Sequence, residues 1–295
     1  MINVVVVGYG NISKSAIKGV LEAKDLNLVG IVVRKPMDIP GIDVPVVTNV
    51  DELNVRVDVA ILGIPSRSVP EVACEYLQKG ISTVDSFDIH TQINETRDKL
   101  NKVAKQGGAV AITAAGWDPG SDSVIRCMMQ AMVPTGVTYT NFGPGMSMGH
   151  SVAVKAIDGV VDAISMTIPV GTGIHRRMVY VQIEDGADFA KIAETVKADP
   201  YFVHDETHVM QVEDINEVKN AGHGVLLERL GMSSGVNNQR MSFTMTIDNP
   251  ALTAQILVSC ARAAARMMSG CYTIIEIPPV NLLPGDKRDW IRKLV

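Results

Sequence analysis

The sequence is poor in several features that would each point to a particular class of protein. Aromatic residues make up only 4% of the 295 residues, so few side chains are present on which nucleic-acid bases could stack. Acidic residues outnumber basic ones by 32 to 27, the opposite of the balance in nucleic-acid-binding proteins. No apolar run approaches the roughly 20 residues of a membrane-spanning helix. We therefore expect neither nucleic acid nor a membrane as a partner.

Cysteine is scarce as well. The sequence contains no CxxC pair, and its cysteines lie in apolar runs at Cys74, Cys127, Cys260 and Cys271. This usage is typical of buried, unpaired thiols in a reducing compartment. No Cys/His cluster has metal-ligand spacing, and the N-terminus runs directly into a predicted strand without a basic targeting segment. These observations predict a cytoplasmic protein without a metal site.

What the chain does have is a regular alternation of strands and helices in its first third. The predicted strands cover residues 2–8, 26–33, 57–64, 81–86 and 109–114, and the predicted helices cover 11–24, 70–78 and 94–105. Strands that alternate with helices form a parallel, doubly wound sheet, with helices on both faces because the crossovers are right-handed. The sequence therefore predicts an α/β domain at residues 1–118.

The middle of the chain has a different pattern. Strand-like segments cover residues 137–142, 161–169, 178–184, 208–213 and 241–247, with a helix at 188–198. This pattern predicts a mixed or antiparallel sheet in a second, α+β domain at 119–254. A long helix at 251–268, with Arg262 and Arg266 on its polar face, and a strand at 273–277 follow. We expect residues 255–295 to return to the first domain.

A glycine-containing turn follows the first predicted strand. Gly8 allows a tight turn, Gly10 lets the backbone approach a phosphate, and Asn11 and Ile12 open a helix whose first amides would face the anion. This context is typical of a dinucleotide-binding fingerprint. The third glycine position holds Ser13, so the motif is incomplete. A plain strand–helix turn is the alternative.

The end of the second predicted strand distinguishes the nicotinamide cofactors. An NAD site usually has an acidic residue there, which binds the ribose 2′-hydroxyl. This chain has Arg34 and Lys35 instead, and two cations favour the 2′-phosphate of NADP. Alternatively, the two residues belong to a solvated loop. Gly63 and Ser66, which end a later strand on the same edge, are candidates to border the nicotinamide ribose.

Polar residues gather among glycines at the ends of the predicted strands. In chain order they lie in the motifs VGYGN, VDSFDxH, GWDPG, FGPGxSxGHS, HRR, GHG and DNP, between residue 4 and about residue 250. Each motif is weak alone, but together and in this order they resemble the meso-diaminopimelate dehydrogenases. The resemblance implies an NADP-dependent enzyme of lysine biosynthesis with a Rossmann-type domain, a dimerisation and substrate domain, and a homodimeric assembly.

The resemblance also implies roles for individual residues. Asp88 and Asp118 would hold the amine of the D-configured reacting centre. Trp117, Met148 and Gly149 would wall that part of the pocket. The distal L-amino-acid end would be held by Phe142, Thr167, Arg177, His223 and Asn249.

The implied chemistry agrees with these residue types. The small-molecule substrate carries two ammonium groups and two carboxylates. Asp88 and Asp118 suit an ammonium, whereas Arg177 offers a two-pronged hydrogen bond to a carboxylate. The implied reaction is reversible oxidative deamination to L-2-amino-6-oxopimelate, which cyclises to tetrahydrodipicolinate, and ammonia. Either aspartate would take the proton from the amine.

Structural roles remain as alternatives for the same residues. Asp88 is placed to cap a helix, Asp118 to initiate a turn before Pro119, and Arg177 to be a surface charge. The segment at 169–175 is shorter than in many members of the family. A more open pocket would suit an NADP-dependent dehydrogenase of broader D-amino-acid or 2-oxo-acid specificity. A non-catalytic NADP-binding sensor is a third hypothesis, although a sensor needs no acids in the pocket.

Overall fold

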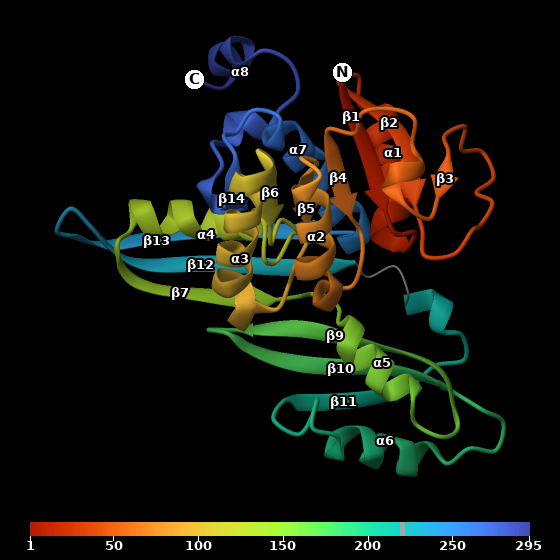
Figure 1. The fold of residues 1–295 in the computed structure, drawn as a ribbon. Coiled ribbons are helices and arrows are strands. Elements are labelled where there is room, and N and C mark those ends of the chain that lie inside the picture. The colour runs from red at the N-terminus through yellow and green to blue at the C-terminus, as the bar shows by residue number, and fades with distance from the viewer. Residues whose placement is uncertain (219–221) are drawn as a thin grey trace. The chain divides into compact units, whose positions relative to one another are not determined.

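The computed structural model describes residues 1–218 and 222–295 (Figure 1). The chain divides into two compact units. Unit 1 comprises Met1–Cys127 and Pro250–Val295, and unit 2 comprises Met128–Asn249. Among the described helices, none combines the length and the apolar character that crossing a membrane requires.

A seven-stranded sheet forms the centre of unit 1, in the order β14-β6-β5-β4-β1-β2-β3, and every pairing is parallel. Its strands are β1 (Ile2–Val7), β2 (Leu26–Val32), β3 (Val46–Val47), β4 (Val59–Leu62), β5 (Ser82–Asp85), β6 (Val110–Thr113) and β14 (Gly270–Thr273). The helices are α1 (Asn11–Glu22), α2 (Val69–Gln78), α3 (Ile93–Gly107), α4 (Ser121–Met132, which continues into unit 2), α7 (Asn249–Ala264) and α8 (Lys287–Leu294). The predicted α/β class and parallel sheet are confirmed.

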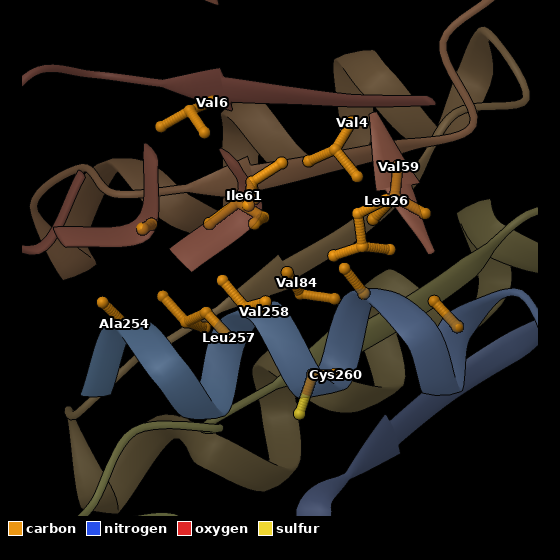
Figure 2. Close-up of a cluster of buried hydrophobic side chains, with 14 of the residues drawn as sticks. Val4, Val6, Leu26, Val59, Ile61, Val84, Ala254, Leu257, Val258 and Cys260 are labelled. Atoms are coloured by element: carbon orange, nitrogen blue, oxygen red, sulfur yellow. The ribbon is translucent and has the colours of Figure 1, made fainter. Parts of the chain in front are cut away.

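Both faces of this sheet are buried, which explains the continuous valine run of β1. Alternate residues point to opposite faces, so Val4 and Val6 join one core cluster and Val5 and Val7 the other. The first cluster includes α1 and α7, and the second includes α2 and α3. Figure 2 shows part of the first cluster, with Leu257 of α7 beneath the sheet. A sheet covered in this way presents its carboxyl edge to a ligand.

The strand expected at residues 273–277 is placed wrongly by the sequence pattern. The strand is β14, which ends at Thr273, and Ile274–Glu276 forms a short 3₁₀ turn. The cause is local, because the Glu276 carboxylate accepts hydrogen bonds from the backbone N–H and the hydroxyl of Thr273 at 2.8 and 3.0 Å. β14 pairs with β6, so the end of the chain contributes a strand to the sheet of unit 1.

Two predictions of side-chain exposure are also wrong: Arg262 was expected to be exposed and Cys127 to be buried. Arg262 is only 5% exposed, and its Nε donates to Oδ2 of Asp25 at 2.7 Å. Because α7 lies against the sheet, the buried guanidinium of Arg262 needs a charged or hydrogen-bonding partner. All four cysteines are free, as predicted, but Cys127 on α4 is exposed, whereas Cys260 and Cys271 are buried.

Unit 2 contains two sheets, whereas the sequence pattern predicts one mixed or antiparallel sheet. One has the order β11-β10-β9-β8 and the other β13-β12-β7. Their strands are β7 (Thr135–Phe142), β8 (Gly145–Met146), β9 (Val160–Gly171), β10 (Ile174–Ile183), β11 (Glu206–Gln211), β12 (His223–Ser233) and β13 (Val236–Ile247). The pairs are antiparallel except β10 with β11. The helices α5 (Met148–Lys155) and α6 (Phe189–Ala198) pack on the first sheet through Val154, Ile192 and Val196.

The sequence pattern did not predict β12, because polar residues interrupt its apolar alternation. Arg229 is 2% exposed, and its guanidinium donates to the backbone carbonyls of Val133 and Pro134 and to the Thr138 hydroxyl. These hydrogen bonds satisfy the buried guanidinium of Arg229, a residue type that is usually exposed.

The short segment at 169–175 forms a tight hairpin between β9 and β10. Thr172 and Gly173 both have positive φ, at 52° and 79°, the signature of a type I′ turn. Gly171 pairs with Ile174 immediately before and after it. The connection therefore needs no longer loop.

Candidate active site

The turn after β1 brings backbone N–H donors to the start of α1. Gly10 caps α1 without a side-chain hydrogen bond, and the first turn of this 12-residue helix contains no acidic residue. The N–H groups of Asn11 and Ile12 therefore lie at the positive end of a helix, where an anion is favoured. A Cβ atom built on Gly10 would have no neighbour within 4 Å, so space for a phosphate exists beside it.

The other residues of this turn are determined by close contact with the end of β4. Gly8 has φ of +93°, and a Cβ there would lie 2.6 Å from the carbonyl oxygen of Gly63. Ser13 is fully buried, and its hydroxyl donates to the same carbonyl at 3.1 Å. A serine fits at the third position of the fingerprint because Gly63 has no side chain, and so the incomplete motif is compatible with a nucleotide site.

Charged residues stand at the carboxyl end of β2. Arg34 and Lys35 are exposed, and neither forms an ion pair with any residue that the structure describes. Ser66 begins a 3₁₀ turn (Ser66–Ser68) after β4, and its Oγ accepts a hydrogen bond from the Asp88 N–H at 3.3 Å. These positions fit a dinucleotide, although a solvated loop would also leave the two cations exposed.

The segment after β5 is held by Asp85, a carboxyl group with no exposed surface. Its Oδ1 accepts hydrogen bonds from the Phe87 N–H, the Thr113 hydroxyl and the Ala114 N–H, whereas its Oδ2 has no hydrogen-bond partner among the described residues. Burial raises the pKa of Asp85 to about 6. These bonds fix the loop from which Asp88 projects.

Asp88 itself is exposed and does not cap the following helices. The N-cap residues there are Ile89 for the turn His90–Gln92 and Gln92 for α3, and neither cap uses a side chain. The capping alternative for Asp88 is therefore wrong. Its carboxylate remains available at the carboxyl edge of the sheet.

Asp118 lies in a compact turn between β6 and α4, next to the half-buried Trp117. The Gly116 N–H donates to the Pro119 carbonyl at 3.0 Å, and a Cβ on Gly120 would lie 1.8 Å from the Gly116 carbonyl oxygen. The Asp118–Pro119 bond is cis. Asp118 therefore does occupy a turn, but its side chain also takes part in an ion pair.

That ion pair involves two residues that the sequence analysis missed. Nη1 of Arg126 lies 3.2 Å from Oδ1 of Asp118, and its Nη2 lies 2.8 Å from Oδ2 of Asp122. Asp122 has no exposed side-chain surface, and its pKa is raised to about 7, chiefly by burial and then by the charge of Asp118. The spacing of four residues between 118, 122 and 126 was the available signal.

A cavity of about 610 Å³ lies beside this turn in unit 1. Pro119, Ser123, Arg97 and Glu276 are among its lining residues. The charges on its wall pair with each other, because Nε and Nη2 of Arg97 contact both carboxylate oxygens of Glu276 at 2.9 and 2.5 Å. Asp98 also lines the cavity, with its Oδ1 3.6 Å from Nη1 of Arg97, so the one arginine of this wall is already shared by two carboxylates.

In unit 2, Arg177 and Thr167 lie on the paired strands β10 and β9. The Arg177 side chain is 13% exposed, its Nε contacts Oδ2 of Asp205 at 2.6 Å, and its Nη1 donates to the Thr167 hydroxyl. The surface-charge alternative is therefore wrong. Asp205 fixes one edge of the guanidinium, and no described residue accepts a hydrogen bond from Nη2.

Phe142 lies beside the same strands. Its backbone N–H donates to Nε2 of His175 at 2.9 Å, which requires the imidazole to carry its proton on Nδ1. Burial, followed by the charge of Arg177, lowers the pKa of His175. His223 begins β12 and Asn249 begins α7; both are half-buried, and burial lowers the pKa of His223.

Met148 and Gly149 open α5. The side chain of Met148 lies outside the part of the chain that the structure describes, and Gly149 is exposed. The neighbouring His150 is structural, since its Nε2 donates to the Tyr201 carbonyl and its Nδ1 accepts from the Ser147 hydroxyl. Asp88, Trp117 and Asp118 thus belong to unit 1, and the other predicted substrate residues belong to unit 2.

Comparison with protein families assigns each part of the chain. Residues 2–113 match the model of the oxidoreductase family with an NAD-binding Rossmann fold. Residues 116–249 match the C-terminal domain of diaminopimelic acid dehydrogenase. The first match agrees with the parallel sheet of unit 1, so the chain carries an NAD(P)-binding Rossmann domain.

Individual proteins resemble the chain over its whole length. The meso-diaminopimelate D-dehydrogenase of Bacteroides fragilis is 54% identical, over 98% of both chains. A Corynebacterium glutamicum DAP dehydrogenase, solved in complex with DAP, has a TM-score of 0.82 at 31% identity and covers 100% and 99% of the two chains. An engineered D-amino acid dehydrogenase bound to NADP⁺ has a TM-score of 0.75 at 30% identity, with the same coverage.

Proposed function

Because the chain belongs to the meso-diaminopimelate D-dehydrogenase family, we propose that it catalyses the NADP-dependent oxidative deamination of meso-2,6-diaminopimelate at its D-centre. The products are ammonia and L-2-amino-6-oxopimelate, which cyclises to tetrahydrodipicolinate, and the reaction is reversible. The observation that carries this proposal is the 54% identity over 98% of both chains. Unit 1 then serves as the dinucleotide-binding domain and unit 2 as the dimerisation and substrate domain.

The first chemical task is to deprotonate the substrate ammonium, because an ammonium nitrogen has no lone pair to assist departure of a hydride. Asp88 and Asp118 follow β5 and β6, which are neighbours in the sheet. We assign both to the amine of the D-centre, and we assign the proton transfer to Asp118, whose carboxylate is fixed by Arg126. Trp117, Met148 and Gly149 would surround this centre.

The bound nicotinamide would supply the hydride acceptor for the Cα hydrogen, the step for which no side chain of the chain is suited. The protein contributes orientation. At the distal end of the substrate, Arg177 offers Nη2 to the L-carboxylate while Asp205 and Thr167 hold the rest of its guanidinium. Phe142, His223 and Asn249 complete this end in the proposal.

The residues present fit NADP. The amides of Asn11 and Ile12 would bind the pyrophosphate, next to the open space at Gly10. Arg34 and Lys35, without ion-pair partners among the described residues, would bind the 2′-phosphate. Gly63 and Ser66 would border the nicotinamide ribose, and Gly8 forms the turn that makes this approach possible.

An NADP-dependent dehydrogenase for other D-amino acids is the second candidate. The observation that favours it is the tight β9–β10 hairpin at Thr172 and Gly173, which adds no loop near the strands that carry Arg177 and Thr167. With fewer residues around the L-amino-acid end of the substrate, the pocket would discriminate less strongly against substrates that lack this second amino-acid group.

The decisive experiment measures reduced-nicotinamide formation by the purified protein with meso-diaminopimelate, its LL-isomer and several D-amino acids, each with NADP⁺ and NAD⁺. We expect turnover with the meso compound and NADP⁺, and none with the LL-isomer. Asp118→Asn should lose on the order of 100-fold or more in kcat with NADP⁺ affinity unchanged. Equal rates with all D-amino acids would favour the second candidate, and no turnover with any of them would refute both.

The cofactor assignment has its own test within the same panel. Each charge-assisted hydrogen bond to a phosphate contributes about 1.5–3 kcal/mol, so Arg34→Ala together with Lys35→Ala should weaken NADP⁺ binding by at least about 100-fold. Affinity for NAD⁺, which lacks the phosphate, should change little. Equal losses for the two cofactors would contradict the assignment of these cations.

A further inference from the structure

The turn at Asp118 continues into α4 with a second, hidden carboxyl group. One guanidinium, that of Arg126, contacts Asp118 through Nη1 at 3.2 Å and Asp122 through Nη2 at 2.8 Å. Both contacts come from adjacent nitrogens of one planar group, so the two carboxyl groups lie side by side. The Asp118 side chain is 14% exposed and that of Asp122 is 0% exposed.

This arrangement has too little positive charge for two ionised carboxylates. Asp118 and Arg126 are the charged groups that act on Asp122, and the Ser123 hydroxyl lies 3.5 Å from Oδ1 of Asp122. With both acids ionised the cluster would have a net charge of −1, and one of its anions would be completely removed from water. A proton on Asp122 would remove this excess charge, and a protonated carboxyl group can donate a hydrogen bond to a carboxylate beside it.

We propose that Asp122 is a positioning residue that shares one proton with Asp118 and thereby determines when Asp118 can accept a proton from the substrate ammonium. This inference rests on the proposed function. While the shared proton is present, the hydroxyl of Asp122 donates to the Asp118 carboxylate and holds it in place for the ammonium. The carboxylate is then a good ionic partner and a weak base.

Loss of the shared proton to solvent changes the role of Asp118. The negative charge now on Asp122 repels the charge of Asp118, and transfer of a proton to Asp118 relieves this repulsion. The substrate ammonium then transfers one proton to Asp118, leaving a neutral amine and a carboxylic acid, so that proton and charge balance. The buried neighbour converts Asp118 from a binding group into a base.

The energetics of Asp122 agree with this sequence of events. Burial and the charge of Asp118 raise the pKa of Asp122, Arg126 lowers it, and the result is about 7. A raised pKa keeps the proton on the pair below neutral pH and releases it above. We therefore expect the rate of oxidative deamination to rise with pH on a limb with an apparent pKa near 7.

The test is the pH dependence of kcat for NADP⁺ reduction with the substrate that the wild-type protein uses. Asp122→Asn keeps the side-chain shape but removes the second acid. It should move the rising limb down by about one pH unit or more and lower its plateau, because Asp118 becomes a weaker base. Arg126→Met removes the cation and should move the limb in the opposite direction. Misfolding cannot produce opposite shifts.

A matched control breaks another aspartate–arginine pair of the same unit. Asp25 precedes β2, at the amino edge of the parallel sheet, and pairs with Arg262. Asp25→Asn should leave the pH profile unchanged. If Asp122→Asn retains the wild-type limb, the inference is wrong even though the enzyme is active.

Infrared spectroscopy detects the shared proton without measuring activity, and so it tests this inference separately from the proposed function. The carbonyl stretch of a protonated carboxyl group, followed as the infrared difference between the wild-type protein and Asp122→Asn, should disappear as pH rises through about 7. The difference removes the corresponding band of Asp85, which both proteins share. A wild-type protein inactive on every substrate but with this band would refute the proposed function alone. A wild-type protein without the band refutes the shared proton.

Discussion

The buried carboxyl group of Asp85 shows how a single residue can link local structure to pH. It is fully buried, and three hydrogen bonds to Oδ1 do not compensate for burial, so its pKa is raised to about 6. An ordinary aspartate in the unfolded chain has a pKa near 3.9. Because the folded-state value is higher, the protonated group favours folding below about pH 4, and this contribution is lost as pH rises through 6.

We predict that Asp85→Asn removes this pH dependence. The amide oxygen can accept the same three hydrogen bonds, and the variant carries no charge at any pH. The free energy of unfolding of the variant relative to wild type should improve by roughly 2 kcal/mol between pH 4 and pH 7. Urea denaturation at both pH values measures this difference, with Asp98→Asn, an exposed site on α3, as the control. A pH-independent difference would mean that Asp85 ionises normally.

At the scale of elements, the approach of the β1–α1 turn to the end of β4 controls the cofactor region. A Cβ on Gly63 would lie 2.0 Å from Ser13 Oγ and 3.1 Å from Ser13 Cβ, so rotation of the serine does not remove the conflict. Gly63→Ala should cost about 1–3 kcal/mol of unfolding free energy. Adding Ser13→Gly should recover most of this loss, as measured by denaturation midpoints.

Gly10→Ala is the matched control for that pair. Its φ of −80° suits alanine and no atom lies within 4 Å of the new Cβ, so folding stability should stay near wild type. Cofactor affinity should fall, because the methyl group occupies the space assigned to the pyrophosphate. If the double variant is no more stable than Gly63→Ala alone, the conflict is not with Ser13.

At the scale of the whole molecule, the sheet β13-β12-β7 supports the homodimer that we propose. Its register places Val137, Leu230 and Arg240 opposite one another on one face, and Val137 is 51% exposed. Tyr139 and Glu228 follow on the same face. A face of apolar and polar residues suits a two-fold contact with a second copy, in which the same patch serves both chains.

We predict that Leu230→Glu converts the protein to a monomer, because it places a charge at the centre of this face. Sedimentation velocity should show the wild type as a dimer and the variant at half the mass, with unchanged circular dichroism. Val161→Glu, at a 55% exposed valine of the other sheet, should remain dimeric. A wild-type monomer at micromolar concentration would contradict the proposal, and a dimeric Leu230→Glu would exclude this face.

Much of the fold was predictable because its signals are local. The valine run of β1, the glycines of the following turn and the periodicity of α1 each depend on neighbours within a few residues, and those predictions are confirmed. The wrong predictions concern positions whose burial or backbone conformation depends on contacts that the sequence pattern does not show. The sequence pattern places Arg262 on the surface, but in the folded chain it pairs with Asp25, which is 237 positions away. The pattern likewise predicts a strand at Ile274, where a capping box between Thr273 and Glu276 forms a turn.

The sequence by itself determined the α/β class, the position of the glycine turn after β1 and, through its ordered motifs, the family, because these follow from short-range patterns and from residue identity. Only the tertiary structure decided that Ser13 fits against Gly63, that Arg177 is held by Asp205 and Thr167, and that Asp122 joins Asp118 on Arg126. Burial and proton sharing are properties of the surroundings of a side chain. Folding, and not sequence spacing, creates those surroundings.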